Sequence, residues 1–389
     1  MIIEPRIRGF ICTTAHPVGC ATNVQRQIDH VVVKGPIESP RKRVLVLGCS
    51  TGYGLASRIV TTFGSGADTV GVSFEKEPGE TKTASAGWYN NRAFEKRARA
   101  AGRIAVTVEG DAFSDAAKAQ TIAAIRDNLG EVDLVVYSLA SPVRTDPKTG
   151  TTYRSAIKPM GEAVRSKTLD TGTGAVSEVE IQPATADEAE ATVKVMGGED
   201  WELWVDALRE AKVLAPDFMT LNYTYLGSEL TWPIYHKGTL GRAKADLDRA
   251  AAAMRERYGS ESAFVVALKA VVTQASSAIP VVPLYGTLLL KVMEEMGLGE
   301  GCIEQIDRLF RVKLQPPLEL DKESRVHVDD WELSEAVQAE MGRRWPLLSS
   351  ETLAQHADLD RYRREFLRLF GFGLGGVDYS ADIDPREPA

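Results

Sequence analysis

Between residues 43 and 140 the chain alternates short apolar runs with segments of helical periodicity. Four runs, RVLVLG, ADTVGVSFE, IAVTVEGD and VDLVVYSLA, have the length and composition of buried strands. The segments between them have helical spacing, and the helix before the fourth run ends at Gly130, a typical C-terminal residue. This alternation predicts right-handed βαβ units. We therefore expect an α/β fold with a doubly wound parallel sheet of the Rossmann type, similar to that of short-chain dehydrogenases.

The pattern breaks after the fourth apolar run. Residues 143–185 are rich in Thr, Gly, Lys and Pro, and their one alternating run, VSEVEI, predicts loops and a hairpin. Helices and two more strands follow, and residues 300–370 have a mostly helical pattern. No internal repeat or low-complexity linker divides the chain. We expect one Rossmann-type domain over residues 1–389, with an insertion at about 143–216 and a helical C-terminal extension at about 297–389 that form the substrate side.

The first apolar run leads into the turn GCSTGYG, which contains Gly48, Gly52 and Gly54. A glycine turn between a strand and a helix lets backbone N–H groups and the helix N-terminus face a pyrophosphate, whereas a side chain would block that approach. A tight turn also needs glycine for purely structural reasons. The position of this turn at the start of a βαβ series favours a dinucleotide site.

Acidic residues end the next two strands. Glu75 lies about 20 residues beyond the glycines, where a carboxylate can accept hydrogen bonds from the adenosine ribose and repel a 2′-phosphate. This position favours NADH over NADPH, and the alternative is a solvated charge at a strand end. Asp111 is placed to bond the adenine amino group. The segment SLASP after the fourth strand leaves room for the cofactor, and Leu139 and Ala140 are its candidate contacts.

The stretch YTYLGSELTWPIYHKGTLGRAK places Tyr235 nine positions before Lys244. At about 100° per residue, this spacing puts the two side chains on opposite faces of a regular helix. Pro233, Gly238 and Gly241 instead predict that Tyr235 precedes the helix and that Lys244 lies in its first turns. The two side chains can then converge.

A converging tyrosine and lysine suit a reductase. A tyrosine with a pKa of about 10 donates poorly to an enolate, and a nearby ammonium stabilises the phenolate that remains and can hold the nicotinamide ribose. In the alternative interpretation, Tyr235 is a packed aromatic residue and Lys244 a surface residue of the helix. His236 and Lys237 are close enough in sequence to compete for the role.

Composition narrows the class of ligand. The net charge of −8 argues against nucleic-acid binding, which needs a basic surface. The four cysteines form no CxxC pair and the five histidines form no metal-binding motif, so we expect a cytoplasmic protein with reduced thiols and no metal. No signal peptide is predicted, and no apolar stretch reaches the roughly 20 residues of a membrane span. We expect no stable membrane association.

Three further segments accompany the stretch NYTYLGSELTWPIYHKGTLGRAK. They are MIIEPRIRGFICTTAHPVGC at the N-terminus, GCSTGYGLASR at the glycine turn, and KAVVTQASSAIPVVPLY at residues 269–285. Together these segments closely resemble the FabV class of enoyl-acyl-carrier-protein reductases, whose near relatives are trans-2-enoyl-CoA reductases. The resemblance extends to FGFGLGGVDYSADID at residues 370–384, essentially the whole chain. The Tyr-x8-Lys spacing is specific to this group among short-chain-type reductases.

The resemblance implies that the protein reduces the 2,3-double bond of an enoyl thioester with NADH in fatty-acid elongation, as a monomer, on acyl carrier protein or coenzyme A. Tyr235 would be the proton donor, Lys244 would bind the cofactor, and Tyr225 would contact the substrate at its thioester carbonyl. The further cofactor contacts that it implies are Gly48, Cys49, Ser50, Thr51, Gly52, Tyr53, Phe74, Glu75, Asp111, Ala112, Leu139, Ala140, Thr273, Gln274 and Ala275.

Other interpretations stay open at this point. A ketoreductase or alcohol dehydrogenase on the same scaffold would use the same Tyr–Lys pair on a carbonyl, and a non-catalytic NADH-binding protein would leave the pair idle. The apolar stretch 278–290 suits an acyl groove and core packing equally well. The basic residues Arg92, Lys96, Arg97 and Arg99 could meet an acidic carrier protein, although a solvated helix face explains them better.

Overall fold

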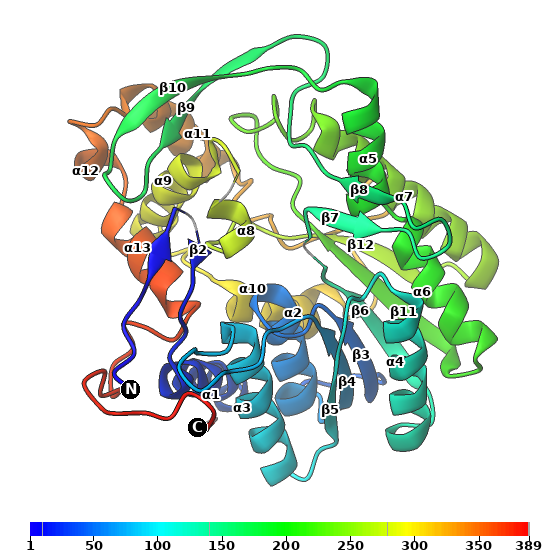
Figure 1. Cartoon of the computed structure of the whole chain (residues 1–389). Coiled ribbons are helices and arrows are strands. Elements are labelled where there is room, and N and C mark those ends of the chain that lie inside the picture. Colours follow the sequence, from blue (N-terminus) through cyan, green and yellow to red (C-terminus); the bar gives the residue numbers. More distant parts are fainter. Residues whose placement is uncertain (10, 140, 278, 388–389) are drawn as a thin grey trace.

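The computed structural model describes residues 1–9, 11–139, 141–277 and 279–387, and a seven-stranded sheet forms its centre (Figure 1). All neighbouring strands of this sheet pair in parallel, in the order β13–β12–β11–β6–β3–β4–β5. The strands are β3 (Arg43–Leu47), β4 (Asp68–Ser73), β5 (Ala105–Glu109), β6 (Val132–Tyr137), β11 (Leu214–Thr224), β12 (Ala263–Ala267) and β13 (Val326–His327). The predicted parallel sheet is confirmed.

Helices cover both faces of the sheet, which is why its strands can be apolar throughout. One face carries α1 (Pro17–Val33), α2 (Gly52–Ile59), α3 (Ala86–Ala100) and α10 (Cys302–Arg308). The other face carries α4 (Asp115–Asn128), α6 (Glu199–Glu210) and α7 (Thr239–Tyr258). Trp201 and Trp204 of α6 are fully buried in this layer, so α6 packs on the sheet although its sequence falls within the range of the expected insertion.

The order of the strands reverses at the neighbours β3 and β6, and sheets of this type bind ligands at such a point. Gly48 follows β3 with a φ of +81°, and a Cβ atom there would lie 2.3 Å from the backbone oxygen of Ser138, which follows β6. A Cβ atom at Gly54 would lie 1.9 Å from the backbone oxygen of Gly48. The glycine turn is thus held tightly at the carboxyl ends of the two central strands, and it leads directly into α2.

The remaining elements form hairpins and a helical C-terminal region. They are β1 (Ile7–Arg8), β2 (Ile11–Cys12), η1 (Val60–Gly64), β7 (Val143–Thr145), β8 (Thr152–Arg154), β9 (Val164–Leu169), β10 (Val176–Ile181), α5 (Ala186–Met196), α8 (Gln274–Ser277), α9 (Val282–Glu295), η2 (Leu309–Lys313), α11 (Glu335–Arg344), η3 (Trp345–Leu347), α12 (Leu353–His356) and α13 (Leu359–Arg368). Leu169 of β9 packs with residues of α9 and α11, so the β9–β10 hairpin reaches the C-terminal helices (Figure 1). In the described ranges, every helix falls short of what a membrane crossing requires in length and apolar character.

The basic residues of α3 lie away from the glycine turn. Lys96, Arg97 and Arg99 are exposed in the last turns of α3. Because α3 leads from the carboxyl end of β4 to the start of β5, these turns lie at the opposite edge of the sheet from the glycine turn. Arg92 pairs with Glu95 at 3.3 Å on the same helix. This placement fits a solvated helix face better than a carrier-binding surface.

Candidate active site

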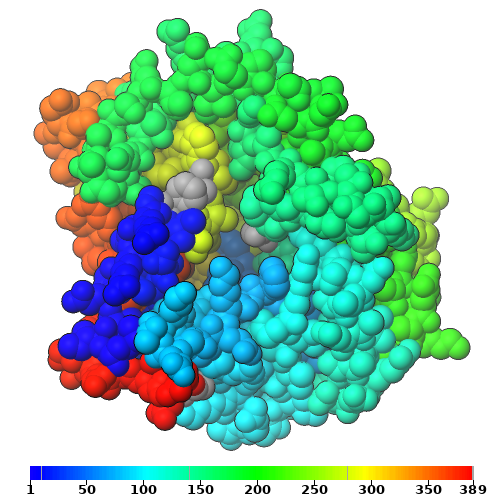
Figure 2. Space-filling view, in the orientation of Figure 1, coloured from blue at the N-terminus to red at the C-terminus, as the bar shows by residue number. Residues whose placement is uncertain are grey.

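Two adjoining cavities lie at the carboxyl ends of the central strands, and Thr273 lines both. The tyrosine cavity, of about 280 Å³, is lined by Tyr225, Tyr235 and Lys244. The Glu75 cavity, of about 450 Å³, lies between the glycine turn, Glu75 and the hairpin β1–β2. The space-filling view shows the molecule hollowed between the dark blue N-terminal hairpin and the teal β7–β8 segment (Figure 2). Together the two cavities offer an extended space of the kind that a dinucleotide needs.

Tyr235 and Lys244 line the same cavity although nine residues separate them. Residues 229–237 form consecutive turns before α7, so Tyr235 precedes the helix and Lys244 lies in its second turn. A Cβ atom at Gly241 would lie 2.0 Å from the backbone oxygen of His236, so only glycine permits this tight entry. The entry lets both side chains line one cavity, whereas a regular helix would put them on opposite faces.

Five tyrosines line the tyrosine cavity, and four of their hydroxyl groups bond to the protein. The four bonds run from Tyr53 to the Lys269 oxygen (2.7 Å), from Tyr137 to Asp200 (3.0 Å), from Tyr223 to Ser57 (2.8 Å) and from Tyr225 to Glu332 (3.0 Å). Ser57 donates its own proton to the Tyr53 carbonyl, so Tyr223 is the donor in its bond. Among the residues described, Tyr235 has no hydroxyl partner. Its proton is therefore the one tyrosine proton of this cavity that is free for a ligand.

Burial sets the charge state of the Tyr–Lys pair. Burial raises the pKa of Tyr235 above its usual range, so the hydroxyl keeps its proton at neutral pH. Burial also lowers the pKa of Lys244 to about 8. Asp248, one turn further along α7, opposes this shift, but its carboxylate binds Arg325 at 2.8 Å. The Lys244 ammonium is thus present at neutral pH and makes no ion pair with any carboxylate of the described chain.

Tyr225 lies edge-on to Tyr235, with 5.1 Å between the ring centroids. Its hydroxyl donates to Glu332, whose side chain is fully buried, and Tyr285 donates to the same carboxylate oxygen at 2.6 Å. Burial raises the pKa of the Glu332 carboxyl. The sequence did not identify Glu332, because it lies 107 residues beyond Tyr225 in a segment that carries no recognisable motif.

Glu75 lies beside the glycine turn, as its place in the sequence predicted. The Ser50 hydroxyl donates to Glu75 at 2.5 Å, and a Cβ atom at Gly87 would lie 2.0 Å from the same carboxylate oxygen. Thr51 and Gly52 line the Glu75 cavity, so the N-terminus of α2 and this carboxylate border one space. The neighbouring Phe74 lines the same cavity. The arrangement suits a pyrophosphate at the helix and a ribose at the carboxylate, and these contacts stay predictions.

Most of the other predicted cofactor residues also line the two cavities. Leu139, Thr273 and Ala275 line the tyrosine cavity with Tyr53, and Gln274 lines the Glu75 cavity. Ala140 lies outside the described residues.

Five predicted cofactor residues line neither cavity: Gly48, Cys49, Ser50, Asp111 and Ala112. The N–H groups of Gly48 and Cys49 both donate to the Val72 oxygen, at 2.9 and 3.1 Å. These bonds hold the turn against β4 and do not point into either cavity. At the end of β5, Asp111 accepts a hydrogen bond from a backbone N–H two residues on, and Ala112 is buried in the core. Their roles toward a cofactor stay predictions.

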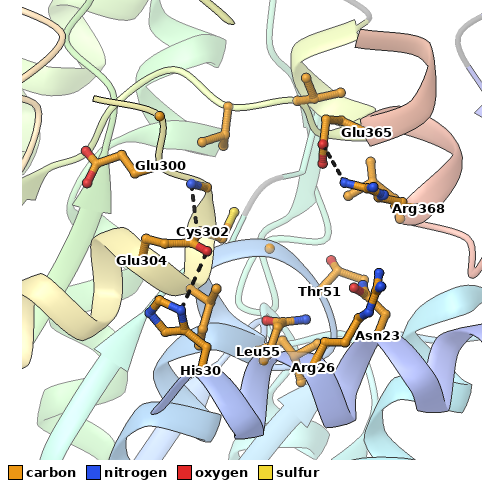
Figure 3. Close-up of a pocket in the computed structure, with 18 of the residues that line it drawn as sticks. Asn23, Arg26, His30, Thr51, Leu55, Glu300, Cys302, Glu304, Glu365 and Arg368 are labelled. Carbon is orange, nitrogen blue, oxygen red and sulfur yellow. Dashed lines mark hydrogen bonds and ion pairs between the residues drawn. The ribbon is translucent and has the colours of Figure 1, made fainter. Parts of the chain in front are cut away.

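A third cavity, of about 460 Å³, adjoins the glycine turn at Thr51 and Leu55 (Figure 3). Its charged side chains include Arg26, His30, Glu300, Glu304, Glu365 and Arg368. Glu365 and Arg368 pair at 2.7 Å, and Glu304 accepts a hydrogen bond from the Gly301 N–H at 2.9 Å. Because charges of both signs line it, this cavity does not indicate one class of ligand.

The fold and the two adjoining cavities define a class of protein. A doubly wound sheet with a glycine turn at its switch point, an acid after the second strand, and a free tyrosine hydroxyl near an ammonium together define a nicotinamide-dinucleotide-dependent reductase. Family models narrow this class. Residues 2–80 match the NAD(P)H binding domain of trans-2-enoyl-CoA reductase, and residues 82–315 match the trans-2-enoyl-CoA reductase catalytic region.

Individual relatives agree with the family models over the whole chain. The chain is 55% identical to an enoyl-[acyl-carrier-protein] reductase [NADH] of Edwardsiella ictaluri over 99% of this chain and 98% of the relative. It is 54% identical, with the same coverage, to the reductase FabV of Aeromonas salmonicida. The structure of Treponema denticola trans-2-enoyl-CoA reductase in complex with NAD matches with a TM-score of 0.94 and 46% identity, over 99% of this chain and 98% of that one. The chain belongs to the family of FabV-class enoyl reductases and trans-2-enoyl-CoA reductases.

A third family model, an enoyl reductase FAD binding domain, matches residues 320–383. The residues of this segment do not fit a flavin. Val337 and Met341 of α11 and Leu353 of α12 are buried against α9, so the apolar side chains of these helices fill a core instead of lining a slot for a flat ring. α13 borders the charged cavity of Figure 3, and Leu369 and Phe370 directly after it line the Glu75 cavity, which already suits a dinucleotide. In the described residues, no cluster of three His, Cys, Asp or Glu side chains could hold a metal ion either.

Proposed function

We propose that the protein reduces the 2,3-double bond of trans-2-enoyl thioesters with NADH, and that Tyr235 is the proton donor. The observation that carries this proposal is the free Tyr235 hydroxyl in the cavity that Lys244 also lines and that adjoins the cavity of the glycine turn. The other four tyrosine hydroxyls of the cavity already donate to protein acceptors.

NADH, when bound, supplies a hydride to the β-carbon of the thioester, and negative charge then develops on the thioester oxygen. The Tyr235 hydroxyl donates a hydrogen bond to that oxygen and then its proton, where the buried cavity makes such donation most effective. The Lys244 ammonium stabilises the phenolate that remains and holds the nicotinamide ribose. Tyr225 contacts the substrate with its ring, because its hydroxyl proton is held by Glu332. The enol that results moves its proton to the α-carbon, so that enoyl thioester, NADH and a proton give saturated thioester and NAD⁺.

The Glu75 cavity holds the adenosine half of NADH. Thr51 and Gly52 face the pyrophosphate with the N-terminus of α2, and Glu75 accepts from the ribose hydroxyls. Thr273 lies between the two halves because it lines both cavities. Leu139 and Ala275 contact the nicotinamide half, and Asp111 bonds the adenine amino group from the end of β5.

The substrate is an enoyl group on acyl carrier protein, the carrier that names the most similar sequence relatives, and coenzyme A thioesters serve in its place. Ile157, Met196, Ile279 and Val282 line the apolar part of the tyrosine cavity and contact the acyl chain. The protein works as a monomer in the cytoplasm. Its 389 residues act as one catalytic unit, with the hairpin segment after β6 and the C-terminal helices on the substrate side.

The test is NADH absorbance on mixing the protein with crotonyl-CoA, followed by mass spectrometry of the product. We expect NADH oxidation and a thioester two mass units heavier. Acetoacetyl-CoA is the matched carbonyl substrate, and its reduction to a 3-hydroxy thioester would instead support a ketoreductase. NADH binding without turnover of either thioester would leave only a cofactor-binding protein.

A further inference from the structure

We propose that Glu332 is a positioning residue for this reaction: it holds the hydroxyl proton of Tyr225 and so keeps the Tyr225 ring against the donor Tyr235. This inference rests on the proposed function. Glu332 comes from the C-terminal region between β13 and α11, whereas both tyrosines lie between β11 and α7. The role therefore gives the C-terminal region a direct part in orienting the donor.

The hydrogen bonds around Glu332 fix the direction of each tyrosine proton. Oε1 accepts from Tyr225 at 3.0 Å and from Tyr285 at 2.6 Å, and Oε2 accepts from the Ala270 N–H at 2.7 Å. Both tyrosine hydroxyls are the donors to Oε1, so both tyrosine protons point toward Glu332. The Tyr225 hydroxyl then offers no proton to the cavity, and Tyr235 remains the donor without a rival.

The position of Glu332 is itself held from the cofactor side. Ala270 follows Lys269, whose N–H donates to Gln305 at 2.9 Å and whose carbonyl accepts from Tyr53 of the glycine turn at 2.7 Å. Gln305 in turn donates to the Tyr53 hydroxyl at 2.6 Å. One continuous set of hydrogen bonds therefore joins the glycine turn, the segment after β12, and Glu332. Displacement of Glu332 is opposed at several points.

A carboxylate suits this position better than an amide of the same shape. An amide has one accepting oxygen and one NH₂ donor group, whereas three donors surround Glu332. With its oxygen toward the Ala270 N–H, the amide NH₂ would face Tyr225 and Tyr285, whose hydroxyls would have to turn. The Tyr225 proton would then be free to enter the cavity, and its ring would lose the bond that orients it.

The experiment is steady-state kinetics of full-length Glu332→Gln with NADH and crotonyl-CoA. We expect the KM for crotonyl-CoA to rise and kcat to fall, for a combined loss in kcat/KM of about tenfold to a hundredfold, with the KM for NADH unchanged within about twofold. Tyr225→Phe should give the same pattern. The double variant should be no worse than the poorer single variant by more than about twofold, because both changes break one interaction.

Glu300→Gln is the matched control. Glu300 is a buried acid of the same C-terminal region, it pairs with Arg308 at 2.8 Å, and its carboxylate accepts from neither Tyr225 nor Tyr285. We expect this control to lower Tm while the kinetic constants stay within about twofold of wild type. If Glu332→Gln does not fold, Glu332→Met replaces it, since an apolar residue of similar volume removes the acceptor and adds no polar group of its own. The Tyr225, Tyr285 and Ala270 donors then lose their partner, which lowers Tm but still tests the kinetic constants.

Two results would overturn the role of Glu332. One is a folded Glu332 variant with a kcat/KM for crotonyl-CoA within about twofold of wild type. The other is a double variant in which the losses of the two single variants multiply, since that would show that Glu332 does not act through Tyr225. A wild-type protein that reduces no enoyl thioester would contradict the proposed function instead.

Discussion

The glycine turn and Glu75 come from two neighbouring βα units, although the hairpin β1–β2 and residues 273–274 also border their cavity, whereas the tyrosine side is assembled from distant segments. Gly48, Ser50, Gly52 and Glu75 lie within two neighbouring βα units, and most of their contacts are to backbone or to one another. On the tyrosine side, Tyr235 belongs to a hydrophobic cluster that also includes Ile181 of β10 and Val282 of α9. From this difference we expect the glycine-turn side to determine which cofactor binds and the tyrosine side to determine the turnover rate.

The largest expected effect tests the tyrosine side. Tyr235→Phe removes the free hydroxyl and should lower kcat by about two to four orders of magnitude, the usual contribution of one positioned acid. NADH affinity should change little, because the ring and the glycine turn stay intact. Stopped-flow turnover with crotonyl-CoA and a fluorescence titration with NADH separate the two quantities. Near-normal turnover would assign the donor elsewhere, with Tyr225 as the next candidate.

The next effect tests the glycine-turn side. Glu75 is expected beside the adenosine ribose, where the 2′-phosphate of NADPH would bring nearly two negative charges. Like charges about 4 Å apart cost on the order of a few kcal/mol at a partly buried site, which is roughly a hundredfold in preference. Glu75→Ala should raise kcat/KM for NADPH and lower it for NADH, measured at one salt concentration.

If Glu75→Ala leaves the ratio of kcat/KM for NADH to kcat/KM for NADPH unchanged, the glycine-turn side does not select the cofactor. Selectivity would then lie elsewhere in the protein. Lys76 follows directly and is exposed, so its ammonium offsets part of the repulsion. Lys76→Met is therefore the matched control. It should lower the use of NADPH by wild type, in the direction opposite to Glu75→Ala.

The same contrast explains how much of the fold was predictable from sequence. β3 to β6 and the helices between them were predicted because each shows a strand-like or helical spacing of apolar residues and is ended by a local glycine or capping residue. The two-residue strand β13 was missed, since it is too short for any pattern and exists only because it pairs with the edge of β12. α1 was also missed, although Val24, Ile28 and Val31 follow a helical period and are buried in the core.

The site divides in the same way. The spacing of Tyr235 and Lys244, read with the glycines between them, was enough to predict that Tyr235 precedes the helix and that Lys244 lies in its first turns, because the geometry of the helix entry is local. Glu332 could not be predicted, since one acidic residue among others near residue 330 carries no sign of the tyrosine it contacts. Its contact exists only once β12, β13 and α9 have packed together.

NADH binding should depend on pH, because the charge of Lys244 on the tyrosine side contributes to holding the cofactor. Because burial lowers its pKa to about 8, the ammonium is present at pH 7 and is mostly lost by pH 9. The KM for NADH should therefore rise by up to about tenfold between these values in wild type. Lys244→Met should bind NADH more weakly at pH 7 and lack this rise. A rise of the same size in both proteins would show that another group titrates.

The smallest effect concerns stability. Lys244→Met should make the protein more stable although it weakens NADH binding. The Lys244 pKa falls from 10.5 to about 8, so the unfolded chain binds this proton more tightly than the folded protein does. For such a group, stability rises with pH between about 8 and 10.5, and the folded state carries a cost of up to roughly 3 kcal/mol at neutral pH. Lys244→Met removes that cost while keeping an unbranched apolar stem in the cavity. Its Tm at pH 7 should exceed that of wild type by about 3 °C.

The control for this effect is Lys96→Met, at an exposed lysine of α3 far from the site, which should leave Tm unchanged within about 1 °C. The Tm difference between wild type and Lys244→Met should also shrink as the pH rises from 7 toward 10, since wild type gains the stability that its buried ammonium withholds. A lower Tm for Lys244→Met at every pH would mean that the ammonium is stabilised in the folded protein. Lys244 would then have a structural role on the tyrosine side. It would no longer connect the side that selects the cofactor with the side that sets the rate.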